Sequence, residues 1–337
     1  MIAKFFRARW SPRVLSLPFA AWMVCLGSSA PAQTSLTSVS LRLDFLPAGY
    51  HAPLFLAAQR GYYREHGIDL QISDGRGSNP SLQSVAAGND LIVLANYGTM
   101  TEGITKGMPV IGVGGLIQRL PDAVISLKGS GIKTPKDLEG RSMTIPPASA
   151  VFKLFAAFVT ATGIDMSKIT QVQTDSNAVL TGLLQGQVDF TTGWVFTDAL
   201  KVESQKPIDP PMLFADYGVN VLAAGFVVQK ATATTKGDII RRFLTATAKG
   251  YQEGLKDPEA AVAAMIQARP SGSNELWLKQ LKLVGPFLQT ERSKGLGFGW
   301  TAHEDWVQTV DILKKYFGMT ASVDPASLYT NDFLPSQ

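Results

Sequence analysis

The sequence predicts an α/β protein with two lobes and a ligand cleft between them. Segments of strand and helix character alternate through both halves of the chain, which is typical of sheets covered by helices. The polar, glycine- and proline-punctuated stretch SLKGSGIKTPKDLEGRSMTIPP separates a first α/β set from a second. Hydrophobic residues make up 45% of the chain, which is enough for a core in each lobe.

The first lobe is predicted to open with a strand, a helix and a second strand in residues 41–77. LRLDF alternates apolar and polar residues as a strand does, and Pro47 and Gly49 interrupt it in the turn PAGYH. Apolar residues then recur at helical spacing up to Gly61, and IDLQIS follows as the next strand. In open sheets of this kind, ligands bind beyond the carboxyl ends of the strands. The turn at residues 44–51 is therefore a predicted ligand contact.

The remaining segments continue the alternation of helices and strands. PSLQSVAAGND is a predicted helix, and LIVLANYG and MPVIGVGGLI are predicted strands of the first lobe. In the second lobe we expect strands at SMTIP, ITQVQT and VDFTTG, with helices near residues 150–162 and 178–185. VLAAGFVVQK is expected to return to the first lobe as a strand, and the chain is mostly helical from residue 235.

This order predicts two crossings between the lobes, near residues 123–129 and 217–226. The first part of lobe 1 is assigned to residues 33–125 and lobe 2 to residues 126–220. The return strand and the C-terminal helices of lobe 1 are assigned to residues 221–337. The cleft between the lobes is the default ligand site of such an architecture.

Residues 1–32 are interpreted as a secretory signal peptide that is removed. MIAKFFRARWSPR carries basic and no acidic residues, an apolar run follows up to Leu26, and Ala30-Pro31-Ala32 offers small residues for cleavage. The run is short of the about 20 apolar residues that span a bilayer. Cys25 as a lipid-anchor site is the alternative, which the large residues before it disfavour. We therefore expect the mature protein in the periplasm.

The charge and length of the mature chain exclude several classes of function. Removal of the signal takes away Lys4, Arg7, Arg9 and Arg13, so 31 − 4 = 27 basic residues face 27 acidic ones. This balance gives no reason to expect nucleic acid or an anionic membrane as a partner. The remaining chain has 337 − 32 = 305 residues. A single hydrophobic core stops growing at a chain length of about 250 to 300 residues, so two lobes are expected. The mature chain also has no cysteine, which excludes disulfides and thiol chemistry.

Candidate ligand contacts of the first lobe follow three predicted strands. They are Asp44, Phe45, Tyr50, His51, Arg76, Ser78, Asn96 and Tyr97. The aromatic rings and the imidazole could stack on and hydrogen-bond a planar ligand, whereas in the alternative interpretation Phe45 is core and His51 caps the turn. Arg76 and Ser78 offer donors to an acidic group or belong to an exposed turn. Asn96 is the expected polar contact, and Tyr97 alternatively packs.

Candidate contacts of the second lobe are Ser149, Trp194 and Asp198. Ser149 lies in PPASA, which leads from a strand into a helix, so backbone N–H groups there can hold a polar or anionic group. Alternatively, Ser149 only caps that helix. Trp194 and Asp198 follow the VDF strand and are expected to face the cleft, unless Trp194 is part of the core.

Enzyme motifs are missing from the sequence, and we expect neither catalysis nor a cofactor or metal. His51, His66 and His303 lack metal-ligand spacing. The chain has no G-x-S-x-G and no phosphate loop, and the glycines of GLGFG do not follow a predicted strand. A sensory receptor lobe and a periplasmic enzyme that uses scattered Asp and Ser remain the less favoured alternatives.

Several segments resemble the periplasmic substrate-binding proteins of ABC importers. They are LDFLPAGYHAPLFLAAQRGYYREHGIDL, GSNPSLQSVAAGND, KTPKDLEGRSMTIP, LLQGQVDF and DPASLYTNDFLP. The resemblance covers nearly all of the mature chain. It points to the group that spans binders of thiamine-pyrimidine precursors and binders of sulfonates, taurine and nitrate, and the last segment favours the pyrimidine branch.

The resemblance implies a two-lobed periplasmic binding protein type II fold. Such a protein closes around a small molecule and presents it to a permease with its ATPase subunit, and we expect a monomer. Pyrimidine binders tend to have a Glu after the VDF strand, where this chain offers Asp198, and sulfonate binders tend to have Trp-x-Pro, which Trp194-Val195-Phe196 is not. Catalytic relatives that make the pyrimidine carry a cysteine-rich motif that is missing here. The favoured ligand is a planar nitrogen heterocycle, and a small anion such as an alkanesulfonate is the alternative.

Overall fold

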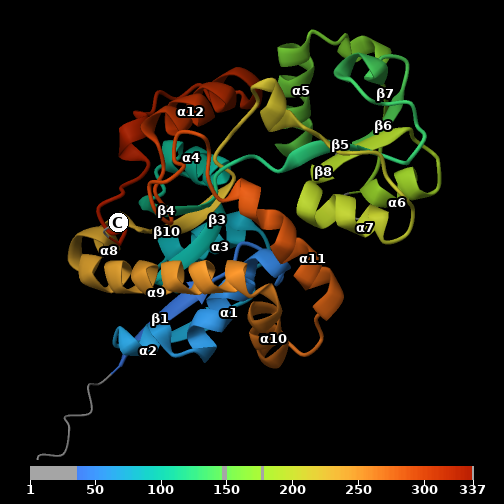
Figure 1. The fold of residues 1–337 in the computed structure, drawn as a ribbon. Helices are drawn as coiled ribbons and strands as arrows, with labels where there is room; N and C mark the ends of the chain where they lie inside the picture. The colour runs from blue at the N-terminus through green and yellow to red at the C-terminus, as the bar shows by residue number, and fades with distance from the viewer. Residues whose placement is uncertain (1–35, 146–149, 176–177, 336–337) are drawn as a thin grey trace, which may run out of the picture. The chain divides into compact units, whose positions relative to one another are not determined.

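Two five-stranded sheets form the framework of the computed structural model, which describes residues 36–145, 150–175 and 178–335 (Figure 1). The first sheet has the strand order β2-β1-β3-β10-β4. Its strands are β1 (Thr37–Arg42), β2 (Ile68–Ser73), β3 (Ile92–Asn96), β4 (Val110–Ile117) and β10 (Ala224–Gln229). The second sheet has the order β7-β6-β8-β5-β9. Its strands are β5 (Asp122–Ser126), β6 (Ser142–Ile145), β7 (Thr170–Gln173), β8 (Phe190–Trp194) and β9 (Met212–Leu213).

The opening strand–helix–strand unit is confirmed, but its first strand lies earlier than predicted. β1 ends at Arg42, so only Leu41 and Arg42 of LRLDF belong to the strand and the rest of LRLDF lies in the turn. β1 pairs with β2 in parallel, from Thr37 opposite Ile68 to Arg42 opposite Ser73. A 3₁₀ turn, η1 (Gly49–His51), and the helices α1 (Ala52–Gln59) and α2 (Tyr62–Glu65) connect the two strands. Gly61, between the two helices, has φ 79°, a conformation that favours glycine. The turn residues therefore lie at the carboxyl end of β1, where the sequence placed them.

Helices cover both faces of the first sheet, and alternate residues of its strands face them. In β3, Ile92 and Leu94 belong to one buried apolar cluster, and Val93 and Ala95 belong to another. This period of two is that of a strand buried on both faces. The first cluster includes α1 and α9 (Gly237–Lys256), which contact each other along the sheet (Figure 1). The second includes α3 (Ser78–Ala86), α4 (Tyr97–Thr105) and α12 (His303–Phe317).

The chain passes from the first sheet to the second between Ile117 and Asp122. β5 occupies most of the stretch where the first crossing was expected, and it pairs antiparallel with β8, with Asp122 opposite Trp194. All its residues are buried, so it shows no alternation of polar and apolar residues that would have marked it as a strand. The return strand is as expected, because β10 pairs antiparallel with both β3 and β4.

The remaining helices complete the two halves. The second sheet carries α5 (Ala150–Thr162), α6 (Val179–Leu184), a π-helical turn η4 (Val195–Ala199) and α7 (Leu200–Glu203), with 3₁₀ turns η2 (Pro135–Leu138), η3 (Met166–Lys168) and η5 (Phe214–Tyr217). The C-terminal part adds α8 (Lys230–Thr235), α10 (Pro258–Ala268), α11 (Asn274–Val284), η6 (Gly285–Phe287) and η7 (Pro325–Ser327). Among the described residues, none of these helices combines the length and apolarity that a membrane crossing requires.

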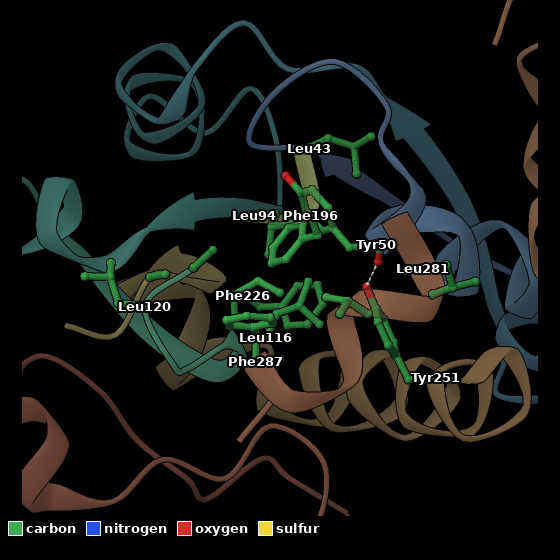
Figure 2. Packing of buried hydrophobic residues seen from close by; sticks show 14 of the residues in the cluster. Leu43, Tyr50, Leu94, Leu116, Leu120, Phe196, Phe226, Tyr251, Leu281 and Phe287 are labelled. Atoms are coloured by element: carbon green, nitrogen blue, oxygen red, sulfur yellow. Dashed lines mark hydrogen bonds between the residues drawn. The ribbon is translucent and has the colours of Figure 1, made fainter. Parts of the chain in front are cut away.

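One buried apolar cluster continues from the first sheet to the second (Figure 2). It contains Tyr50 of η1, Phe196 of η4 and Leu281 of α11. α11 contacts both η1 and η4, so this helix packs against the turn after β1 and the turn after β8. The turn after β1 and the turn after β8 therefore share a common packing partner.

Candidate functional site

The turn after β1 holds a buried network centred on Asp44. The Asp44 carboxylate accepts hydrogen bonds from the Phe45 N–H at 3.0 Å and from the Tyr50 Oη at 2.9 Å, and it lies 2.8 Å from the His51 Nε2. The Ala48 N–H donates to the His51 Nδ1 at 3.0 Å, so Nε2 carries the hydrogen that is donated to Asp44. Burial, and then the charge of Asp44, raises the pKa of Tyr50 well above its ordinary value. Tyr50 and His51 are thus fixed donors within the turn.

α11 holds this turn in place through a hydrogen bond and a close backbone contact. The Gly49 N–H donates to the Gln280 Oε1 at 2.6 Å, and a Cβ on Gly49 would lie 2.0 Å from the Trp277 carbonyl oxygen. From α9, the Tyr251 Oη donates to the Tyr50 carbonyl at 2.7 Å (Figure 2). The approach is so close that a glycine is required at position 49.

Aromatic rings of the second half meet this turn. The Tyr50 ring centroid lies 6.2 Å from that of Trp194 and 5.8 Å from that of Phe196, and the latter two are 5.4 Å apart. These distances are those of interacting aromatic pairs. The Trp194 indole N–H donates to the Asp122 Oδ2 at 3.1 Å, and its backbone N–H donates to the Asp198 Oδ2 at 3.0 Å. The structure therefore brings together Asp44, Tyr50 and His51 with Trp194 and Asp198.

Phe45 lies beside this network but is not part of the core. Its side chain is 56% exposed, and its neighbour Leu46 is also exposed. Trp194 is only partly buried. The exposed ring and the partly exposed indole are apolar surface that a ligand can cover.

The other predicted contacts of the first half have local partners. The Ser78 Oγ accepts the Asn96 N–H at 2.9 Å, and the Asn96 Oδ1 accepts the Thr99 N–H at 2.9 Å and so caps α4. The Gly77 N–H donates to the Asp44 carbonyl at 2.9 Å, which holds the turn after β2 against the turn after β1. Arg76, in the turn after β2, is exposed.

Tyr97 packs in the core, as in the alternative interpretation. Its Oη donates to the Gly114 carbonyl at 2.7 Å, and its ring lies 4.6 Å from that of Trp306. The side chain is buried between β4, β10 and α12, because Gly112 and Gly225 leave room for it. Ser149 and the turn before α5 lie outside the described residues.

Replacement of Tyr97 by Phe should cost stability and leave binding unchanged. The variant removes one donor and leaves the buried Gly114 carbonyl without it, which costs about 1 to 2 kcal/mol of the free energy of unfolding. Urea unfolding measures this loss, and titration of the wild-type ligand measures affinity. A tenfold loss of affinity at unchanged stability would contradict the core assignment.

Sequence reasoning missed Asp122, Phe196 and Gln280. Asp122 begins a strand that was not predicted. Phe196 was considered only as part of a sulfonate-binder pattern. Gln280 lies on a C-terminal helix, 231 positions along the sequence from Gly49, which it contacts. Within residues 36–145, 150–175 and 178–335, no group of three or more His, Cys, Asp or Glu side chains is arranged to hold a metal ion.

Comparisons with known proteins agree with this architecture. A family model described as "NMT1/THI5 like" matches residues 48–261. The riboflavin-binding protein RibY of Chloroflexus aurantiacus is 26% identical over 312 residues, which cover 90% of this chain and 88% of that protein. A 4-amino-5-hydroxymethyl-2-methylpyrimidine phosphate synthase of Legionella pneumophila is 27% identical over 90% of this chain and 95% of its own. The formylaminopyrimidine-binding protein of Halalkalibacterium halodurans is 22% identical over 86% of this chain and 88% of its own.

A solved structure has the same fold. The periplasmic aliphatic sulphonate-binding protein SsuA of Escherichia coli superposes with a TM-score of 0.69 at 14% sequence identity. The superposition covers 86% of this chain and 91% of SsuA. The fold class predicted from the sequence, a two-lobed α/β binding-protein fold, is thereby confirmed.

Proposed function

This chain belongs to the NMT1/THI5-like family, and from this membership and the geometry of the site we propose that it is the extracytoplasmic solute-binding component of an ABC importer. It captures a planar nitrogen heterocycle and delivers it to a membrane permease with its ATPase subunit. The proposal includes a periplasmic location after removal of the signal peptide, and a monomer as the working form.

The observation that carries the proposal is the meeting of aromatic side chains from two turns far apart in sequence. Tyr50 follows β1, Trp194 is the last residue of β8, and Phe196 follows β8. Apolar pockets with a few convergent polar groups are the usual form of small-molecule sites, and flat rings stack well on aromatic walls. Two of the relatives above are named for binding riboflavin or a formylaminopyrimidine, which are both planar nitrogen heterocycles.

The alternative ligand, an alkanesulfonate or another small anion, fits the charges less well. Asp122 and Asp198 contact the Trp194 side chain and backbone, and Asp44 contacts Tyr50. Arg76, which was the candidate partner for an anion, is exposed, and an exposed cation contributes little. Three carboxyl groups around the rings favour a neutral or cationic ligand.

The alternative of an enzyme arises because the Legionella relative is named a synthase. A binding protein leaves its ligand unchanged, whereas an enzyme converts it. In this chain His51 is buried and takes part in two hydrogen bonds within its own turn. We infer that it holds the turn in place. A sensory receptor lobe would also bind without turnover, and import of the ligand by cells that carry the permease distinguishes the two roles.

The purified protein should bind a heterocycle without converting it. Ligand at a hundredfold excess over the dissociation constant stabilises the folded state by about 2.7 kcal/mol, which raises the melting temperature by several degrees. Thermal shift with riboflavin, 4-amino-5-hydroxymethyl-2-methylpyrimidine and the sulfonate MOPS selects the ligand, and mass spectrometry of the recovered compound checks its identity. Recovery of a chemically changed compound would replace the proposal by an enzyme.

A further inference from the structure

Asp122 carries a buried carboxyl oxygen that lacks a partner. The residue begins β5 and is 2% exposed. Its Oδ2 accepts the Trp194 indole N–H at 3.1 Å, but within the described part of the chain its Oδ1 has no hydrogen-bond partner. A buried polar atom without a partner is costly, and such atoms are uncommon in folded proteins. A site of this kind is explained if a ligand supplies the missing bond.

Asp122 adjoins the aromatic rings of the candidate site through its Oδ2, which accepts the Trp194 indole N–H. Asp122 and Trp194 are directly opposite each other in the antiparallel β5–β8 pair, so their side chains lie on the same face of the sheet. The Trp194 ring in turn contacts those of Tyr50 and Phe196. The Asp122 carboxyl therefore belongs to the same group of side chains as the rings.

The surroundings of Asp122 contain a second acid and little compensating charge. Asp198, held by the Trp194 backbone N–H, is its charged neighbour, and Lys201 lies 3.6 Å from Asp198 on the half-exposed side. Burial, followed by the charge of Asp198, raises the pKa of Asp122 from 3.8 to about 7. At neutral pH the carboxyl group therefore exists in both forms, which accept or donate a hydrogen bond.

We propose that Asp122 is the specificity-determining residue of the site: its Oδ1 binds the hydrogen-bonding edge of an uncharged planar nitrogen heterocycle and excludes anions. The inference rests on the proposed function and adds the group that selects among ligands. A ring N–H or amino group donates to Oδ1, and a ring nitrogen or carbonyl accepts from it when it is protonated. A sulfonate offers acceptors and a negative charge, so it is repelled by the carboxylate.

Gln118 provides a matched control. Its amide nitrogen and oxygen also lack partners among the described residues, and it too is buried on the crossing between the sheets. Its side chain, however, lies beside Gly115 and Thr301, and within the described part of the chain it makes no hydrogen bond to any of the rings. Gln118→Met removes an unpartnered polar group of similar size at a place where we expect no ligand.

The test compares Asp122→Leu, Asp122→Asn and Gln118→Met with the wild type. Riboflavin is titrated by quenching of its fluorescence, and 4-amino-5-hydroxymethyl-2-methylpyrimidine and MOPS by calorimetry. For the heterocycle that the wild type binds, Asp122→Leu should weaken affinity at least tenfold, Asp122→Asn should weaken it less, and Gln118→Met should leave it unchanged. Asp122→Asn should also improve binding of MOPS relative to the heterocycle.

Stability without ligand separates ligand binding from a structural role. A folded-state pKa raised above the unfolded value means that the stabilising contribution of Asp122 is present at low pH and is lost as pH rises through about 7. The melting temperature of Asp122→Asn should therefore exceed that of the wild type at pH 8, and the difference should shrink toward pH 5. If Asp122 only supported the fold, its replacement would instead lower the melting temperature of the protein and its affinity for the ligand together.

The outcomes are distinguishable. If the wild type binds a heterocycle and Asp122→Leu binds it equally well, the assignment of Asp122 is wrong and the proposed function stands. If the wild type binds MOPS and neither heterocycle, or none of the three probes, the proposed ligand class fails and the assignment of Asp122 fails with it. Equal weakening in Gln118→Met would also overturn the assignment, because the effect would then not be specific to the ring site.

Discussion

Replacement of Gly49 by Ala should destabilise the protein by about 3 kcal/mol, because overpacking and a lost buried hydrogen bond each cost about 1 to 3 kcal/mol. The added Cβ would lie 2.0 Å from the Trp277 carbonyl oxygen, 2.6 Å from the Gln280 Cβ and 2.9 Å from the Leu281 nitrogen. These atoms belong to or adjoin the backbone of α11, which cannot move aside as the end of a flexible side chain can. Thermal or urea unfolding measures the loss, and the melting temperature should fall by roughly 6 to 12 °C.

Gly285→Ala is the matched control for this prediction. Gly285 directly follows α11, its φ of −44° is helical, and beyond its own chain neighbours and helix backbone a Cβ there would meet no atom within 4 Å among the described residues. An alanine is therefore tolerated, and the variant should melt with the wild type. If Gly49→Ala also melts with the wild type, α11 does not hold the turn after β1 in the way that the structure indicates.

The same contact links stability to binding. η1 carries Tyr50 and His51, and α11 packs against both η1 and η4. Displacement of α11 by a larger residue at position 49 would shift Tyr50 relative to Trp194. We therefore expect the surviving folded Gly49→Ala protein to bind ligand more weakly than the wild type.

The parts of the fold that local sequence determines were predictable. The alternation in LRLDF indicated a strand that overlaps β1 only at Leu41 and Arg42. The break at Pro47 and the positive φ of Gly61 act within a few residues, and they specify the turn and the helices that follow. β5 was not predictable in the same way. It is short and buried throughout, so nothing in its sequence distinguishes it from a connecting segment.

The candidate site was also predictable only where its residues are close in sequence. Asp44, Tyr50 and His51 lie within one turn, and the sequence grouped them correctly as neighbours. Their hydrogen bonds to one another, however, depend on the 3₁₀ geometry of η1. Asp122 and Trp194 are 72 positions apart and meet only because β5 pairs with β8. A partner chosen by sheet register cannot be read from either residue alone.

Trp194→Ala should weaken ligand binding by more than tenfold while the fold remains intact by circular dichroism. The variant removes the stacking surface beside Tyr50 and Phe196 and leaves the Asp122 Oδ2 without its donor. A tenfold change corresponds to about 1.4 kcal/mol, which the loss of a stacked ring and of a buried hydrogen bond readily supplies. Calorimetric titration with the ligand identified by thermal shift measures the effect.

Three further variants show which part of Trp194 matters and which class of ligand binds. Trp194→Phe keeps a smaller aromatic ring and loses the donor to Asp122, so its affinity should fall between those of Trp194→Ala and the wild type. Phe45→Ala should weaken binding without loss of stability, because that ring is exposed. Arg76→Ala should leave the affinity for a heterocycle unchanged, since a solvated cation contributes little. For a sulfonate the order inverts: Arg76→Ala weakens binding and the aromatic variants matter less, because a small anion gains from charge and little from stacking.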